Sequence, residues 1–282
     1  IFTRVGFWKD SIASNLESAR SAKAEKEFDD QLHAMDYLVY AYLQLGQDKK
    51  AGAVLAEMNA ITGVDPRRFV GPYALAASPA RYVVERGDWK GAAELKVRPS
   101  QFAYADAMTH FARALGAARS GMPDAAKPDI AKLAELREKL REAKDAYWSG
   151  QVDIQWQVAT AWVLHAEGKH DDALKAMSAA ADAEDKTEKH PVTPGVPKPA
   201  RELYGVMLLD RGMAKEALAA FEATLKKEPN RLGAYVSAAR AAEKSGDAAK
   251  ARDYHTKVVA IAGAAAQTKA EVADARAFLK KR

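Results

Sequence analysis

The chain has 282 residues, a formal net charge of +5 and no cysteine, which excludes disulfide frameworks, thiolate metal sites and cysteine nucleophiles. Its 43 basic and 38 acidic residues are interleaved, as they are along Glu135–Lys139. This pattern is typical of solvated helix faces, and it argues against a nucleic-acid-binding surface. No apolar run approaches the roughly 20 residues that cross a bilayer as a helix.

Alanine dominates the composition. Its 61 residues are about 22% of the chain, and long stretches consist mainly of Ala, Leu, Lys, Glu and Arg. These are the strongest helix formers, and small side chains let helices pack closely. The composition therefore predicts an all-helical protein. The first residues, Ile1–Trp8, read as the middle of a repeat, so we expect a longer precursor with any export signal upstream.

One local pattern recurs from the first residues onward: a glycine that ends a helical stretch is followed, five residues later, by Ala or Ser. The glycines are Gly6, Gly46, Gly87, Gly121, Gly168, Gly212 and Gly246. Two of the gaps between them equal the 34-residue period of tetratricopeptide repeats. Glycine adopts the left-handed conformation that ends a helix, and the small residue lets the next helix pack back against it.

The pattern predicts a single array of helical hairpins. The expected repeats lie near 1–30, 31–66, 72–97, 101–149, 151–183, 200–229 and 231–263, with a cap helix over 268–282. Pro123 and Pro128 predict a second helix that starts late or kinks and then runs to about Trp148. Between Asp182 and Pro199 the sequence holds four prolines and a glycine, which predicts an ordered, extended strap over 184–199.

The residues that carry a family resemblance are Gly205, Leu208, Gly212, Ala217, Phe221 and Pro229, together with Tyr42, Gly46 and Ala51. They match the tetratricopeptide repeat (TPR) consensus. Four longer stretches, His33–Gly46, Ala80–Trp89, His110–Gly121 and Glu188–Gly205, resemble a group of bacterial TPR proteins without assigned activity. The resemblance covers nearly the whole chain. It implies a right-handed α-α superhelix and a periplasmic or cell-envelope location, with the cytoplasm as the alternative, and no reaction. The repeat array itself favours a protein or peptide partner.

In such an array the first helix of each hairpin lines the concave groove. Counting back from the turn glycines, and adding the neighbour of one position, selects His33, Asp36, Tyr40, Gln44, Arg81, Glu85, Trp162, His165, Arg201, Glu202 and Arg240. Aromatic and arginine anchors are common in binding grooves. We therefore expect these side chains to hold a partner. Truncation of Arg81 or Trp162 is expected to weaken binding and leave the fold intact. The alternative is an ordinary mixed surface.

No catalytic motif is present: GxSxG, GxxxxGK[ST], GxGxxG and HExxH are all missing from the sequence. No two histidines share a helix at the spacing of a zinc site, so the sequence predicts no metal and no cofactor. A site built across repeats, from His33 with His110 or from His190 with Glu202, stays open as an alternative. The leading interpretation is a non-enzymatic binding scaffold. The alternative is an envelope solute- or metal-binding protein that uses the strap as a lid.

Overall fold

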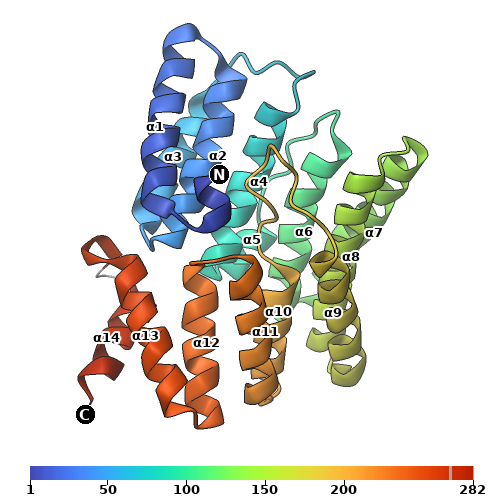
Figure 1. Ribbon diagram of the computed structural model, residues 1–282. Helices are drawn as coiled ribbons and strands as arrows, with labels where there is room; N and C mark the ends of the chain where they lie inside the picture. The colour runs from blue at the N-terminus through green and yellow to red at the C-terminus, as the bar shows by residue number, and fades with distance from the viewer. Residues whose placement is uncertain (267–268, 282) are drawn as a thin grey trace.

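The computed structural model describes residues 1–266 and 269–281, which are α-helical with two short 3-10 turns and contain no strand. The all-α prediction is thus confirmed. The elements, labelled in Figure 1, are η1 (Phe2–Val5), α1 (Trp8–Glu25), α2 (Phe28–Gln44), α3 (Asp48–Ala60), α4 (Val70–Arg86), α5 (Trp89–Ala93), α6 (Ala103–Arg119), α7 (Pro123–Glu142), α8 (Ala146–Ala166), α9 (His170–Asp185), α10 (Ala200–Asp210), α11 (Ala214–Lys227), α12 (Leu232–Ser245), α13 (Ala248–Ala262), η2 (Ala264–Ala266) and α14 (Ala270–Lys280).

The hairpins are set by the turn glycines. All seven have a positive φ, between 66° and 80°, which is the left-handed region that a side chain disfavours. The residue five places after each glycine is buried, from Ser11 at 1% exposure to six alanines at 0%. These six are Ala51, Ala92, Ala126, Ala173, Ala217 and Ala251. The predicted role of the glycine and small-residue pair is therefore confirmed.

The first helices of the hairpins form an inner layer and the second helices an outer layer. Along the inner layer α2 packs on α4, α4 on α6 and α6 on α8, while α10 packs on α9 and α11. Thirteen of the seventeen residues of α2 are buried, against two of the thirteen residues of α3. Helix α2 is therefore covered on several sides, by α1, α3 and α4.

The array closes on itself, since its C-terminal part returns to its N-terminal part. The indole Nε1 of Trp8 donates to the Asn230 carbonyl (2.7 Å), and the backbone N–H of Leu232 donates to Gln44 Oε1 (3.0 Å). A Cβ on Gly6 would lie 2.3 Å from the Pro229 carbonyl oxygen, so the two segments touch backbone to backbone. In an ordinary solenoid each repeat contacts only its neighbours. Figure 1 shows α12 and α13 lying below the N-terminal helices.

Three boundaries differ from the sequence prediction. Helix α7 begins at Pro123, because a proline in the first turn removes an N–H that has no partner there anyway. It ends at Glu142, and Trp148 belongs instead to the first turn of α8, where the Asp145 carboxylate accepts from its N–H (3.1 Å). Helix α9 continues to Asp185, so the strap comprises residues 186–199. Positions 268 and 282 of the expected cap helix lie outside the described residues.

Candidate binding site on the concave face

The concave face is occupied by the strap, residues 186–199. The strap leaves α9, passes in front of α4 and α6, and returns to α10 (Figure 1, gold). Thr193, Pro194, Pro197 and Pro199 are buried. The strap is therefore an ordered segment without helix or strand, which bends at residues 191–193 and 197–198 and packs against the inner helices.

Side chains of the array hold the strap by its backbone. Three tyrosine hydroxyls and three cationic groups donate hydrogen bonds to its carbonyl oxygens. The pairs are Tyr37 with Val192 (2.7 Å), Tyr73 with Gly195 (3.3 Å), Tyr147 with Glu188 (3.2 Å), Arg81 with Gly195 (2.9 Å), Lys227 with Thr187 (3.0 Å), and Arg4 with both His190 (2.8 Å) and Lys189 (3.2 Å). Burial and the Asp36 carboxylate raise the pKa of Tyr37 to about 12, which keeps this hydroxyl a donor.

One side chain of the strap enters an aromatic pocket, which we name the ring pocket and define by Phe69, Tyr147 and Trp148. The imidazole of His190 stacks on Trp148 (centroids 5.0 Å apart, planes at 28°) and meets Phe69 edge-on at 5.8 Å. Its centroid lies 5.4 Å from that of Tyr147. Trp148 also stacks on Tyr104 (centroids 4.3 Å apart, planes at 11°). A second ring therefore holds the Trp148 side chain in place.

Arg81 links the strap to the inner helices. Its fully buried guanidinium pairs with the Asp36 carboxylate, donates to the Gly195 carbonyl (2.9 Å) and lies over the ring of Tyr40. Ser78 Oγ donates to the same Asp36 oxygen (2.8 Å). A buried charge is tolerated only when it is paired and hydrogen-bonded in this way. This arrangement fixes the strap and α4 to α2.

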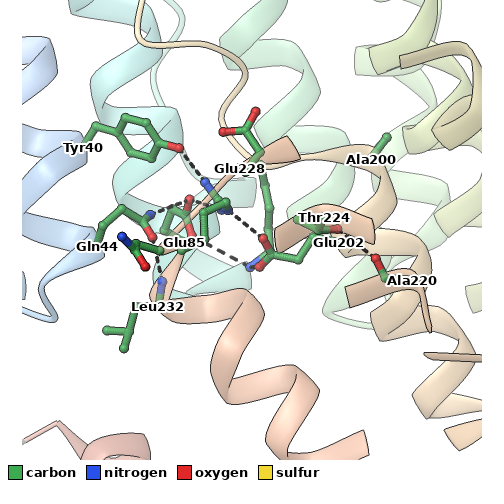
Figure 2. A network of polar contacts seen from close by, with 12 residues as sticks. Tyr40, Gln44, Glu85, Ala200, Glu202, Ala220, Thr224, Glu228 and Leu232 are labelled. Carbon is green, nitrogen blue, oxygen red and sulfur yellow. Dashed lines mark hydrogen bonds and ion pairs between the residues drawn. The ribbon is translucent and has the colours of Figure 1, made fainter. Parts of the chain in front are cut away.

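A second buried cation, Arg231, joins the ends of the array, and Figure 2 labels its partners Tyr40, Glu85 and Glu202. Its guanidinium donates to Tyr40 Oη (2.7 Å), to Glu202 Oε2 (2.9 Å) and to Glu85. Lys198 Nζ lies 3.0 Å from Glu202 Oε1 and 4.0 Å from Glu85 Oε2. We name this group the interior clamp: Tyr40, Gln44, Glu85, Lys198, Glu202 and Arg231. It ties α12 to α2, α4 and α10.

The interior clamp balances two cations against two carboxylates. Burial alone would raise the pKa of Glu202, but Arg231 and Lys198 together lower it to about 2. The pKa of Arg231 is in turn raised above its usual value, since Glu202 and Glu85 outweigh the effect of burial. These two groups therefore stay charged at every physiological pH. The clamp therefore acts as a charged structural link between α12 and the helices α2, α4 and α10.

Six of the eleven predicted groove residues come together. Tyr40, Gln44, Glu85 and Glu202 belong to the interior clamp, and Asp36 pairs with Arg81 beside it. The expectation that Arg81 and Trp162 face an open groove is corrected, because they are 0% and 1% exposed. Arg81 is covered by Asp36, Tyr40 and the Gly195 carbonyl of the strap, whereas Trp162 lies against the Arg119 guanidinium and His165.

The other five predicted residues lie apart from the interior clamp. Trp162 is covered by the Arg119 guanidinium at 4.2 Å, and His165 packs beside Trp162. Arg201 pairs with Asp182 and Asp185 on α9. His33 packs edge-on against Tyr37, and burial lowers its pKa despite the nearby Asp36. Arg240 is exposed. Whether any of these residues binds a partner stays a prediction.

An open space remains beside the interior clamp, between α4 and α12, which we name the polar cleft. It encloses about 680 Å³, part of it open to solvent, and its lining includes Gln44, Glu85, Arg86, Lys198, Arg240 and Lys269. Trp89 forms one wall. Three of the predicted groove residues, Gln44, Glu85 and Arg240, thus share one accessible site.

Sequence reasoning missed the residues that hold the strap and close the array. Arg231 lies in the turn after Pro229 and Asn230, where no helical periodicity assigns a face. Tyr73 and Tyr147 stand in the first turns of their helices, outside the positions counted back from the turn glycines. The sequence leaves His190 open as a metal ligand, whereas the structure packs its ring among aromatic rings. Within the described part of the chain no three His, Asp or Glu side chains converge as metal ligands.

The hairpins and the concave face define a TPR-like helical array, a class of repeat protein that generally serves as a protein-interaction scaffold. Family models and curated proteins give no match. Among solved structures, the chain is similar to a tetratricopeptide repeat protein from Parabacteroides merdae, with 12% identity, a TM-score of 0.49, and coverage of 96% of this chain and 98% of that chain. The assignment to this class rests on the hairpins and turn glycines themselves. Among the described helices, none has the length and apolar character that crossing a membrane requires.

Proposed function

We propose that this protein is a non-enzymatic scaffold that holds an extended segment of a partner protein along its concave face, in the track occupied by its own strap. The carrying observation is the set of side-chain donors directed at six strap carbonyls between Thr187 and Gly195. Main-chain hydrogen bonds supply affinity with little dependence on sequence, and side-chain pockets supply specificity. The track therefore has both elements of a peptide-binding groove.

The strap is suited to be a displaceable occupant. It is a proline-rich segment without helix or strand, and within it the Val192 N–H donates to His190 Nδ1 (3.3 Å). It is anchored mainly through its carbonyls, which any extended chain presents. Because both of its ends continue into helices, the strap competes as an intramolecular ligand at an effective concentration in the millimolar range. A partner that engages the same donors takes its place.

A trans-peptide experiment tests the proposal. Residues 187–198 are replaced by a Gly/Ser linker of equal length, and this strap-replaced protein is titrated calorimetrically with a synthetic peptide of residues 186–199. We expect saturable 1:1 binding. The double variant Tyr37→Phe/Tyr147→Phe, which loses two hydroxyl donors, should bind about tenfold more weakly. The matched control is Tyr82→Phe, a tyrosine of α4 that packs over Gly52, and it should bind normally. A folded protein without saturable binding would overturn the proposal.

The proposal includes no catalytic residue, no cofactor and no nucleic-acid partner. It places the protein in the bacterial periplasm or cell envelope, as the family resemblance implies. Fractionation of the source cells with an antibody against the chain measures the location. Recovery with the cytoplasmic marker alone would contradict the envelope assignment.

A second candidate function, solute binding by an envelope protein, is favoured by the polar cleft. Its wall combines Trp89 with charged side chains of both signs, among them Arg240 and Glu271, a combination that suits a small polar solute with an apolar part. Native mass spectrometry of the purified protein should then show a bound small molecule that Arg240→Ala loses. Spectra that show no bound small molecule for either protein would count against this function.

A further inference from the structure

The ring pocket has the geometry of a specificity pocket in the track. It receives one side chain of the strap, His190, and contacts it with three rings at centroid distances of 5.0 to 5.8 Å. Ring pairs at such separations stabilise each other beyond the burial of their area. The side chains of Glu188 and Pro191 are exposed, whereas the neighbouring Lys189 pairs with Glu228. Several side chains of the strap therefore contact the array, and His190 is the one that makes ring-on-ring contacts.

The pocket is held rigidly on the array. Trp148 stacks on Tyr104 and on His190 and lies in the first turn of α8, which Asp145 caps. Arg4 fixes the register of the occupant, since it donates to the carbonyls of Lys189 and His190 themselves. The stack on Trp148 and the backbone hydrogen bonds from Arg4 thus together determine which residue of the segment enters the pocket. Phe69 and Tyr147 are half-buried, so the pocket is reachable from solvent once the strap leaves.

The pocket favours an uncharged ring. Burial lowers the pKa of His190, and Arg4 lowers it further against the opposing effect of Asp145. The imidazole is therefore neutral at physiological pH, and it contributes a flat polarisable face to the stack on Trp148. A phenyl or phenol ring offers the same face, whereas an aliphatic or small side chain does not.

We propose that the partner segment is recognised by one planar ring side chain, imidazole or aromatic, which enters the ring pocket and is followed by an extended, proline-containing stretch. His190 of the strap is then the intramolecular competitor for that pocket. This inference rests on the proposed function, because it names which segment the concave track selects. The occupant it specifies is a protein segment with the chemistry of the strap.

Four peptides titrated into the strap-replaced protein test the inference. They are residues 186–199 unchanged, the His190→Ala and His190→Phe variants, and Lys186→Ala as the matched control at an exposed position. We expect His190→Ala to bind at least about tenfold more weakly. His190→Phe should stay within about threefold of the unchanged peptide, and Lys186→Ala should match it.

The outcomes separate the two proposals. If the unchanged peptide binds and His190→Ala binds equally well, the ring pocket does not select the segment, and this inference fails while the proposed function survives. If His190→Phe binds as weakly as His190→Ala, recognition by a planar ring is refuted in favour of a specific imidazole contact. If the unchanged peptide does not bind to the folded protein, the proposed function and the inference both fail.

Discussion

Removing the Arg231 guanidinium should open the array, and Arg231→Met is the perturbation that isolates this effect. The substitution keeps an apolar stem but deletes a buried cation that donates to Tyr40, Glu85 and Glu202. Deleting one partner of a buried ion pair destabilises a protein by about 3–5 kcal/mol, because the other charge stays buried without compensation. Lys198 remains 3.0 Å from Glu202 and offsets part of this, so we expect about 3 kcal/mol.

A double variant separates charge imbalance from lost packing. In the unchanged protein Glu202→Gln should destabilise, since it breaks the pair from the acidic side. In the Arg231→Met background the same change removes an uncompensated carboxylate, so it should recover about 1–2 kcal/mol. Urea denaturation at pH 7, followed by far-ultraviolet circular dichroism, measures both changes. Arg240→Met, at an exposed position of α12, is the control and should stay within about 0.5 kcal/mol.

The reasoning would be refuted by either of two results. Arg231→Met with a loss below about 1 kcal/mol would mean that the guanidinium does not hold the ends together. Equal destabilisation by Glu202→Gln in both backgrounds would mean that the carboxylate contributes through packing and not through its charge.

Three further changes test other parts of the structure. Ala217→Leu should overpack the α10–α11 hairpin, where Ala217 is 0% exposed, and lower stability by about 1–3 kcal/mol; an unchanged melting temperature would contradict the hairpin register. Arg81→Ala, expected from the sequence to spare the fold, should instead destabilise it by about 3–5 kcal/mol because Asp36 stays buried and unpaired; a normal urea midpoint would be the contrary result. Burial raises the pKa of Glu184 to about 7, so the folded state binds more protons than the unfolded chain between about pH 4.5 and 7, and its stability falls as pH rises through that window. Glu184→Gln keeps an acceptor for the Ala200 N–H. The melting temperature of this variant should match that of the unchanged protein near pH 5 and exceed it near pH 8. A difference that does not vary with pH would argue against a titrating Glu184.

The hairpins were predictable because their determinants are local. The left-handed glycine and the small residue five places later fix where a helix ends and where the next one packs, within one turn of chain. Burial of Ala51 and Ala217 at 0% exposure shows how strictly this spacing holds. The same counting placed Tyr40, Glu85 and Glu202 on the inner side, where the structure has them.

The closure of the array was not predictable, because it depends on the curvature summed over all the hairpins. Arg231 and Tyr40 are separated by 191 positions, and nothing in their local sequence indicates that they meet. The expected open groove is therefore corrected, because Arg81 and Trp162, which were expected to face it, are buried; binding of a partner on this face stays a prediction. The course of the strap was not predictable either, because its prolines predict an extended chain and not the surface on which that chain lies.

The most direct test of the central claim compares one peptide on two proteins. The peptide of residues 186–199 is titrated into the strap-replaced protein and, under the same conditions, into the intact chain. If the concave track is the binding site, the linked strap competes at an effective millimolar concentration, so a peptide that binds the strap-replaced protein at about 10 µM should bind the intact chain about 100-fold more weakly. Equal affinity for the two proteins would place the peptide elsewhere on the surface and contradict the claim that the concave face holds an extended segment.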